Sequence, residues 1–102
     1  MASRLNLQSE LEELLESRNV YYQPPETVKM QYDAIIYNLS GVRTVKADNK
    51  SYLIDKRYDL TVISRNPENG LVEKLINHFE YISYDRRYIA DNLYHDALTL
   101  YY

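Results

Sequence analysis

The chain has 102 residues, of which 45% are hydrophobic and 26% charged, and it carries a net charge of −3 with no cysteine. This length predicts one domain over residues 1–102, and the missing cysteine excludes disulfides, thiolate metal ligands and a cysteine nucleophile. The net negative charge argues against nucleic acid as a partner. The apolar runs are too short for a membrane span, and the N-terminus lacks the apolar stretch of a signal peptide.

The first part of the chain predicts one helix and one short strand. Leucines at positions 7, 11, 14 and 15 form one stripe with helical spacing, so we expect a helix over residues 4–18 with Asn19 as its left-handed cap. Residues 20–23 follow as a short strand, which ends at Pro24 and Pro25 because proline has no backbone donor.

The middle of the chain predicts two or three strands, which with residues 20–23 makes three or four strands before the next helix. The apolar run at residues 33–39 is typical of a central strand, and Ser40-Gly41 after it predicts a turn or bulge. Two more strands are expected within residues 42–64, joined by a polar tip at residues 48–50. Two faces alternate along the second of them: Tyr58, Leu60 and Val62 on one, Asp59, Thr61 and Ile63 on the other.

A second helix is predicted to start at Asn66-Pro67, with Asn as the cap and Pro at the first helical position. Its apolar face would comprise Leu71, Val72, Leu75, Ile76 and Phe79. Two strands near residues 79–84 and 93–101 complete the chain. We therefore predict an α+β domain with an antiparallel or mixed sheet of about 4–6 strands, two helices packed on one face, and the order α-β-β-β-α-β-β.

His95 and Asp96 invite a catalytic hypothesis, which strand geometry opposes. Neighbouring residues on a strand point to opposite faces, so these two side chains cannot form a relay with each other. No serine lies in a G-x-S-x-G elbow, the carboxylates of Asp55 and Asp59 fall on predicted solvent faces, and two histidines without cysteine argue against structural zinc. We predict no catalytic residue, no metal site and no cofactor.

Tyrosine and arginine alternate in two segments, DKRYDL and YDRRYIAD. Such a pattern can stack on single-stranded nucleic acid, but here aspartates flank the basic residues and would repel phosphate: Asp55, Asp59, Asp85 and Asp91. Tyrosine and arginine are also typical anchors of protein–protein contacts. The pattern therefore favours a protein interface.

Three segments together resemble a known family: VYYQPPETVKMQYDAIIYNL, ADNKSYLIDKRYDLTVISRNPEN and YDRRYIADNLYHDALTLYY. From about Leu7 onward they are similar to small structural proteins of tailed phages and prophages of Gram-positive bacteria, with Tyr84 standing where that group has Phe. The resemblance implies a tail-terminator or tail-completion protein. Members of that class are α+β subunits that form a hexameric ring on the head-proximal end of the tail tube.

The resemblance implies a virion protein made in the host cytoplasm, with no enzymatic activity, no cofactor and no membrane. Its partners would be copies of itself, the tail tube protein and the neck or connector, while DNA only passes through the lumen. The expected subunit contacts are Tyr52, Arg57 and Tyr58 in the central hairpin, and Arg86, Arg87, Tyr88, Asn92 and His95 near the C-terminus. Replacing Arg87 and Tyr88 with Ala is expected to leave a folded monomer and weaken the ring.

Two other functions stay open from the sequence. One is a head-completion ring, a stopper or adaptor, on the portal side of the neck. The other is a small enzyme, which would need a cluster of catalytic or metal-binding side chains that the spacing of residues does not reveal.

Overall fold

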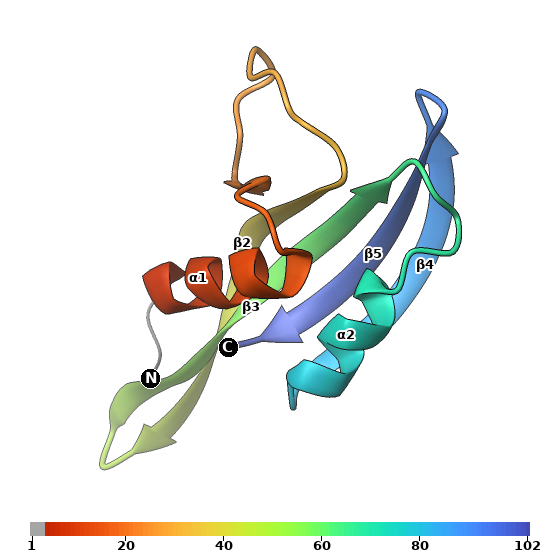
Figure 1. The fold of residues 1–102 in the computed structure, drawn as a ribbon. Coiled ribbons are helices and arrows are strands. Elements are labelled where there is room, and N and C mark those ends of the chain that lie inside the picture. The colour runs from red at the N-terminus through yellow and green to blue at the C-terminus, as the bar shows by residue number, and fades with distance from the viewer. Residues whose placement is uncertain (1–3) are drawn as a thin grey trace.

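The structure is a computed structural model, which describes residues 4–102 and consists of two helices and one five-stranded sheet (Figure 1). The elements are α1 (Arg4–Leu15), β1 (Val20–Tyr22), β2 (Ala34–Ala47), β3 (Lys50–Ser64), α2 (Leu71–His78), β4 (Ile82–Ala90) and β5 (Leu93–Tyr101). The strand order is β1-β2-β3-β5-β4, with β1 parallel to β2 and every other pair antiparallel. The predicted fold class and element order are confirmed.

The core lies between the two helices and one face of the sheet (Figure 1). Tyr58, Leu60 and Val62 of β3 point into it, as the alternation along this strand predicts. The helices and neighbouring strands contribute Leu7, Leu11, Leu71, Leu75, Ile35, Tyr37, Leu98 and Leu100. Each leucine buried in this way stabilises the fold by about 2 kcal/mol, before the entropy of ordering it is subtracted.

Strands β2 and β3 continue past the end of the sheet as a projecting hairpin, seen at the lower left of Figure 1. The β3–β5 ladder ends at Arg57 opposite Tyr101, followed by two backbone hydrogen bonds between Lys56 and Tyr102, so in residues 44–54 β2 and β3 pair only with each other among the described residues. We call residues 44–54 the arm. Its tip is the turn Asp48-Asn49, both in the left-handed region (φ 53° and 62°), as a two-residue hairpin turn requires.

Bulges bend this hairpin near its base. The register shifts between Leu39 and Gly41, which confirms the bulge predicted at Ser40-Gly41, and shifts again between Arg43 and Thr44. A bulge increases the local twist of a strand pair, so the arm turns away from the plane of the sheet.

Several predicted boundaries are wrong. Helix α1 ends at Leu15 rather than at 18, because Glu16 takes the left-handed conformation (φ 60°) that was expected of Asn19. Helix α2 begins at Leu71 and not at Asn66. The Asn66 side chain instead accepts a hydrogen bond from the Glu68 amide (2.9 Å) and forms a turn before the helix.

The last two strands also differ in part from the expectation. β4 covers Ile82–Ala90, later and longer than residues 79–84, whereas β5 covers Leu93–Tyr101 almost as predicted. On α2, Ile76 is 42% exposed and so lies outside the predicted apolar face.

Candidate subunit interface

The predicted contact residues lie at two opposite ends of the sheet rather than in one patch. Tyr52 belongs to the arm, whereas His95 pairs with Ile63 at the far end of β3. With a rise of 3.3 Å per residue, the stretch of β3 between Tyr52 and Ile63 spans roughly 35 Å. The chain therefore carries two unlike candidate surfaces, one on the arm and one on β4 and β5.

The arm exposes apolar side chains on both of its faces. Tyr52 (47% exposed) lies opposite Val45 (50%), and Leu53 (38%) lies opposite Thr44 on the other face, with Ile54 (50%) beside it. A hairpin that projects alone into water is only marginally stable, and apolar groups on both faces add no stability until something covers them. This pattern is typical of a segment that becomes buried in a complex.

An ion pair fixes the base of the arm to the body of the sheet. The Arg43 guanidinium donates through Nε and Nη2 to both carboxylate oxygens of Asp55, and it lies over the rings of Tyr101 (4.4 Å) and Tyr81 (5.6 Å). The hydrogen bond from Arg43 lowers the pKa of Asp55. Asp55 is buried, so the prediction that it lies on a solvent face is wrong.

Arg57 is exposed, but its guanidinium already has a partner within its own subunit. It donates to the Ser40 carbonyl oxygen (2.9 Å) and, through Nε, to the Ser40 hydroxyl (3.0 Å). A Cβ atom at Gly41 would lie 3.2 Å from this guanidinium, so a glycine next to the bulge leaves room for the contact. Arg57 thus stabilises the bulge at the base of the hairpin, and its role in a subunit contact stays a prediction.

Tyr58 is the one predicted contact residue that the structure removes from the surface. Its side chain is 2% exposed and packs edge-on against Tyr37, with 5.8 Å between the ring centroids. The prediction that it contacts a neighbouring subunit is therefore wrong. The alternation of β3 explains the burial, because Tyr58 shares the helix-covered face with Leu60.

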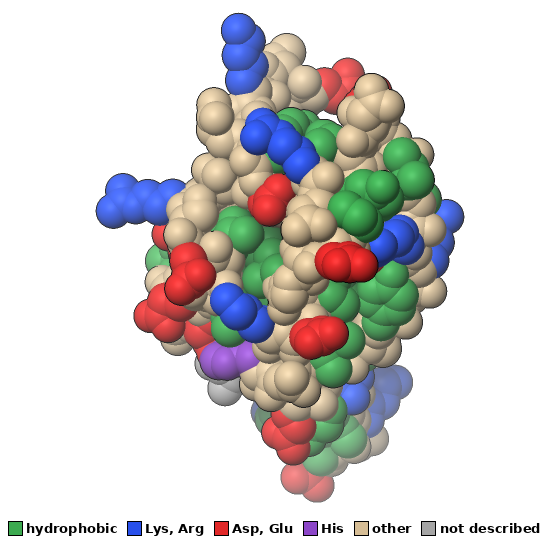
Figure 2. Space-filling view, turned by 45° about the vertical axis from the view of Figure 1, so that its right-hand side comes forward, with side chains coloured by type: hydrophobic (Ala, Val, Ile, Leu, Met, Phe, Trp, Pro, Cys, Tyr) green, Lys and Arg blue, Asp and Glu red, His purple; other side chains and the backbone are tan. Residues whose placement is uncertain are grey.

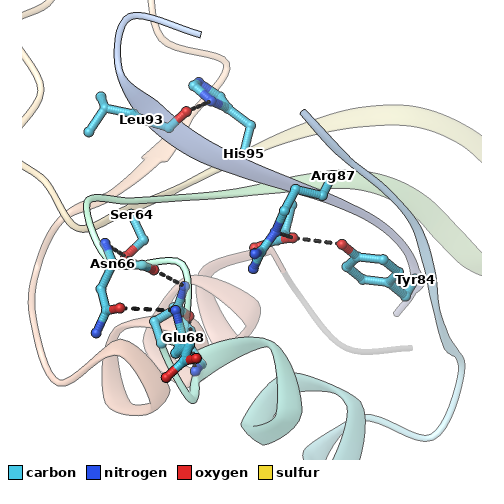
Figure 3. A network of polar contacts seen from close by, with 10 residues as sticks. Ser64, Asn66, Glu68, Tyr84, Arg87, Leu93 and His95 are labelled. Atoms are coloured by element: carbon cyan, nitrogen blue, oxygen red, sulfur yellow. Dashed lines mark hydrogen bonds and ion pairs between the residues drawn. The ribbon is translucent and has the colours of Figure 1, made fainter. Parts of the chain in front are cut away.

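Arg87 belongs to a polar cluster around the buried Asp96, on the side of the sheet where α2 packs (Figure 3). Its guanidinium donates to both oxygens of Asp96 (2.8 and 3.1 Å), and the Tyr84 hydroxyl donates to the same carboxylate (2.7 Å). Burial would raise the pKa of Asp96, but the hydrogen bonds from Arg87 and Tyr84 lower it on balance. The hydrogen bond to Asp96 in turn raises the pKa of Tyr84.

Because Arg87 pairs with Asp96, it has a structural role within its own subunit in addition to the expected role as a subunit contact. Asp96 is completely buried, and without Arg87 it would be an unpaired charge in the core. Replacing Arg87 and Tyr88 together would therefore damage the fold as well as any interface, and Tyr88 alone is the better probe. Sequence analysis missed the cluster because nothing in the local pattern pairs positions 87 and 96, which become neighbours only through the β4–β5 register.

On the opposite face of the sheet, three side chains form a column. The Tyr88 and His95 rings stack with centroids 4.8 Å apart and an interplanar angle of 17°, and the Arg86 guanidinium lies 4.9 Å from the Tyr88 centroid. His95 is held by a contact of its Nδ1 with the Leu93 carbonyl oxygen (3.0 Å) and points away from α2 (Figure 3). His95 and Asp96 thus lie on opposite faces, as predicted.

Asn92 lies beside this column, in the exposed turn that joins β4 to β5. Both residues of the turn, Asp91 and Asn92, are left-handed (φ 52° and 62°), as in the turn at the arm tip. The turn lies at one end of the β4–β5 pair, and Tyr88, which pairs with His95 farther along the same two strands, is 37% exposed.

Among residues 4–102, no three His, Asp or Glu side chains come together in a way that could hold a metal ion. No helix in this part of the chain has the length and apolar content needed to cross a membrane. A scan against protein-family models, a search of curated proteins and a search of solved structures each found no match to this chain.

Proposed function

We propose that this chain is a virion structural protein, the tail terminator of a tailed phage, and that it assembles as a homo-hexameric ring. The observation that carries self-assembly is the arm, whose Val45, Tyr52, Leu53 and Ile54 side chains are 38–50% exposed on both faces of a projecting hairpin. The assignment to the tail rests on the resemblance of the three sequence segments to tail-terminator proteins.

Two unlike surfaces at opposite ends of the subunit support a ring. Contacts between different patches on successive copies are heterologous, and they close into a ring when the rotation between copies allows it. The arm supplies one such patch, and the side of the subunit formed by β4 and β5, away from the arm, supplies another. One face of the ring would match the last ring of the tail tube, and the other would not add a further tube ring, which stops polymerisation.

Electron microscopy of the purified protein, alone and mixed with tail tubes, tests the proposal. We expect rings in the protein alone and a ring on the head-proximal end of the tubes in the mixture. Co-purification with the tail tube protein rather than with portal separates a tail terminator from a head-completion ring. A chain that stays monomeric at every concentration and binds neither partner would contradict the proposal.

A further inference from the structure

The side of the molecule opposite the arm contains a hollow of about 430 Å³ between the turn that precedes α2, the helix itself and β4. Its lining includes Glu68, Val72, Glu73 and Tyr84, with the Arg87–Asp96 pair behind them. Figure 2, which brings this side of the molecule forward, shows apolar and acidic side chains close together, with basic side chains among them. We call this site the α2–β4 hollow.

The α2–β4 hollow combines negative charge with accessible apolar surface. Arg87 and Asp96 neutralise each other, so Glu68 and Glu73 leave the lining with a net charge of −2. Neither of these two carboxylates has a partner among the described residues, and Tyr84 is 44% exposed beside them. β4 is also the edge strand of the sheet, so its outer edge is open to a neighbour.

The arm has the complementary chemistry. Two lysines, Lys46 and Lys50, outnumber Asp48, so residues 44–54 carry a net charge of +1 while the chain as a whole carries −3. Neither lysine has a partner in residues 4–102. Lys50 lies on the same face of the arm as Tyr52 and Val45, and Lys46 lies on the other face, so the end of the arm is basic on both faces and apolar side chains follow it.

From this complementarity we infer that the arm of one copy docks in the α2–β4 hollow of the next copy, with Lys46 and Lys50 close to Glu68 and Glu73. The inference rests on the proposed self-assembly and names the contact that drives it. The arm and β4 lie at opposite ends of the subunit in Figure 1, so each copy can donate its arm on one side and receive one on the other.

Another acidic surface fits the arm less well. A shallow groove along α1 is lined by Glu12 and Glu13, but Arg18 lies in the same groove and cancels part of their charge. Glu12 also accepts a hydrogen bond from Gln8 (2.9 Å) within its own subunit. The α1 groove therefore provides a matched control for the hollow.

Charge reversal on each side, and then on both, tests the docking. The arm variant Lys46→Glu/Lys50→Glu and the hollow variant Glu68→Lys/Glu73→Lys should each raise the dissociation constant for assembly at least about tenfold in sedimentation velocity, because like charges would meet. The chain with all four substitutions should recover most of the wild-type assembly. The control Glu12→Lys/Glu13→Lys should assemble like the wild type, and circular dichroism should show every variant folded.

The outcomes distinguish a failure of the docking from a failure of the proposed self-assembly. A wild-type chain that stays monomeric overturns self-assembly and the docking with it. Wild-type assembly that survives both reversals, or that the fourfold variant does not restore, leaves the ring in place and overturns the docking. Loss of assembly in the α1 control with no loss in the hollow variant would place the arm on α1 instead.

Discussion

The same two strands, β2 and β3, behave differently along their length. Near the helices, one face of β3 is covered and Leu60 is completely buried, while in the arm Ile54 of the same strand is 50% exposed. The amino-acid types are alike in both regions, and what changes is the number of layers around them. β5 pairs no farther than the base of the hairpin, and the helices pack on the body of the sheet, so no element within residues 4–102 covers either face of the arm.

This difference shows that the body is stabilised by contacts within the subunit, whereas the proposed assembly would cover the arm with another copy. Apolar burial stabilises a protein only when water is removed from the side chain, which in the body happens within one subunit. In the arm, water can be removed from the exposed apolar side chains only when another molecule packs against them. Substitutions in the two regions should therefore affect different equilibria, unfolding in one and assembly in the other.

The largest effect on stability is expected from the body. Leu60→Ala removes a side chain that is completely buried between the sheet and the helices, so it should lower the free energy of unfolding by about 3 kcal/mol. The matched arm substitution Leu53→Ala removes the same atoms from a side chain that is 38% exposed. It should change the free energy of unfolding by no more than about 0.5 kcal/mol. Urea denaturation of the monomer measures both, and equal losses would contradict the comparison.

The two arginine–carboxylate pairs extend the comparison to polar groups. Asp96→Ala removes a completely buried acceptor and leaves the Tyr84 hydroxyl and the Arg87 guanidinium without their partner, so it should cost about 2 kcal/mol. Asp55→Ala at the base of the arm should cost less than about 1 kcal/mol, because the Asp55 side chain is 12% exposed and water can enter the site that it vacates, whereas the Asp96 side chain is 0% exposed. Thermal unfolding of the two variants in parallel would contradict this order if the Asp55 variant were the less stable.

The pH dependence of stability gives a smaller effect with a definite sign. The pKa of Asp96 is lower in the folded state than in the unfolded chain, so its contribution is present above the unfolded value near 4 and is lost as the pH falls through the folded value. The wild type should therefore lose stability below about pH 4. Asp96→Asn should flatten that loss in urea titrations from pH 7 to pH 3, and an unchanged slope would show that Asp96 does not contribute to it.

The sequence could predict features that depend on the backbone alone. Adjacent residues of a strand always face opposite ways, so the separation of His95 from Asp96 follows from β5 being a strand, whatever packs around it. The hairpin tip at residues 48–50 and the bulge at Ser40-Gly41 were predictable for the same reason, because turns and bulges select particular residue types.

The features that were missed depend on packing between distant segments. An Asn before Pro suits both a helix cap and a turn, and which one forms at Asn66 depends on where α2 meets the sheet. The Arg87–Asp96 pair depends on the β4–β5 register, which no local pattern specifies. Tyr58 could have been placed correctly, because its own alternation with Leu60 put it on the covered face.

The smallest effect on unfolding, and the clearest on assembly, is expected from Tyr52. Tyr52→Ser removes a ring that is 47% exposed at the centre of the arm, so the free energy of unfolding should change by no more than about 0.5 kcal/mol. The dissociation constant of the ring should rise about tenfold or more, because aromatic anchors dominate the energy of protein interfaces. Leu5→Ser is the control, an apolar side chain on α1 that is 66% exposed and lies outside both the arm and the α2–β4 hollow. If light scattering shows the same assembly for Tyr52→Ser as for the wild type, the arm is not part of the contact, and its apolar side chains need another explanation.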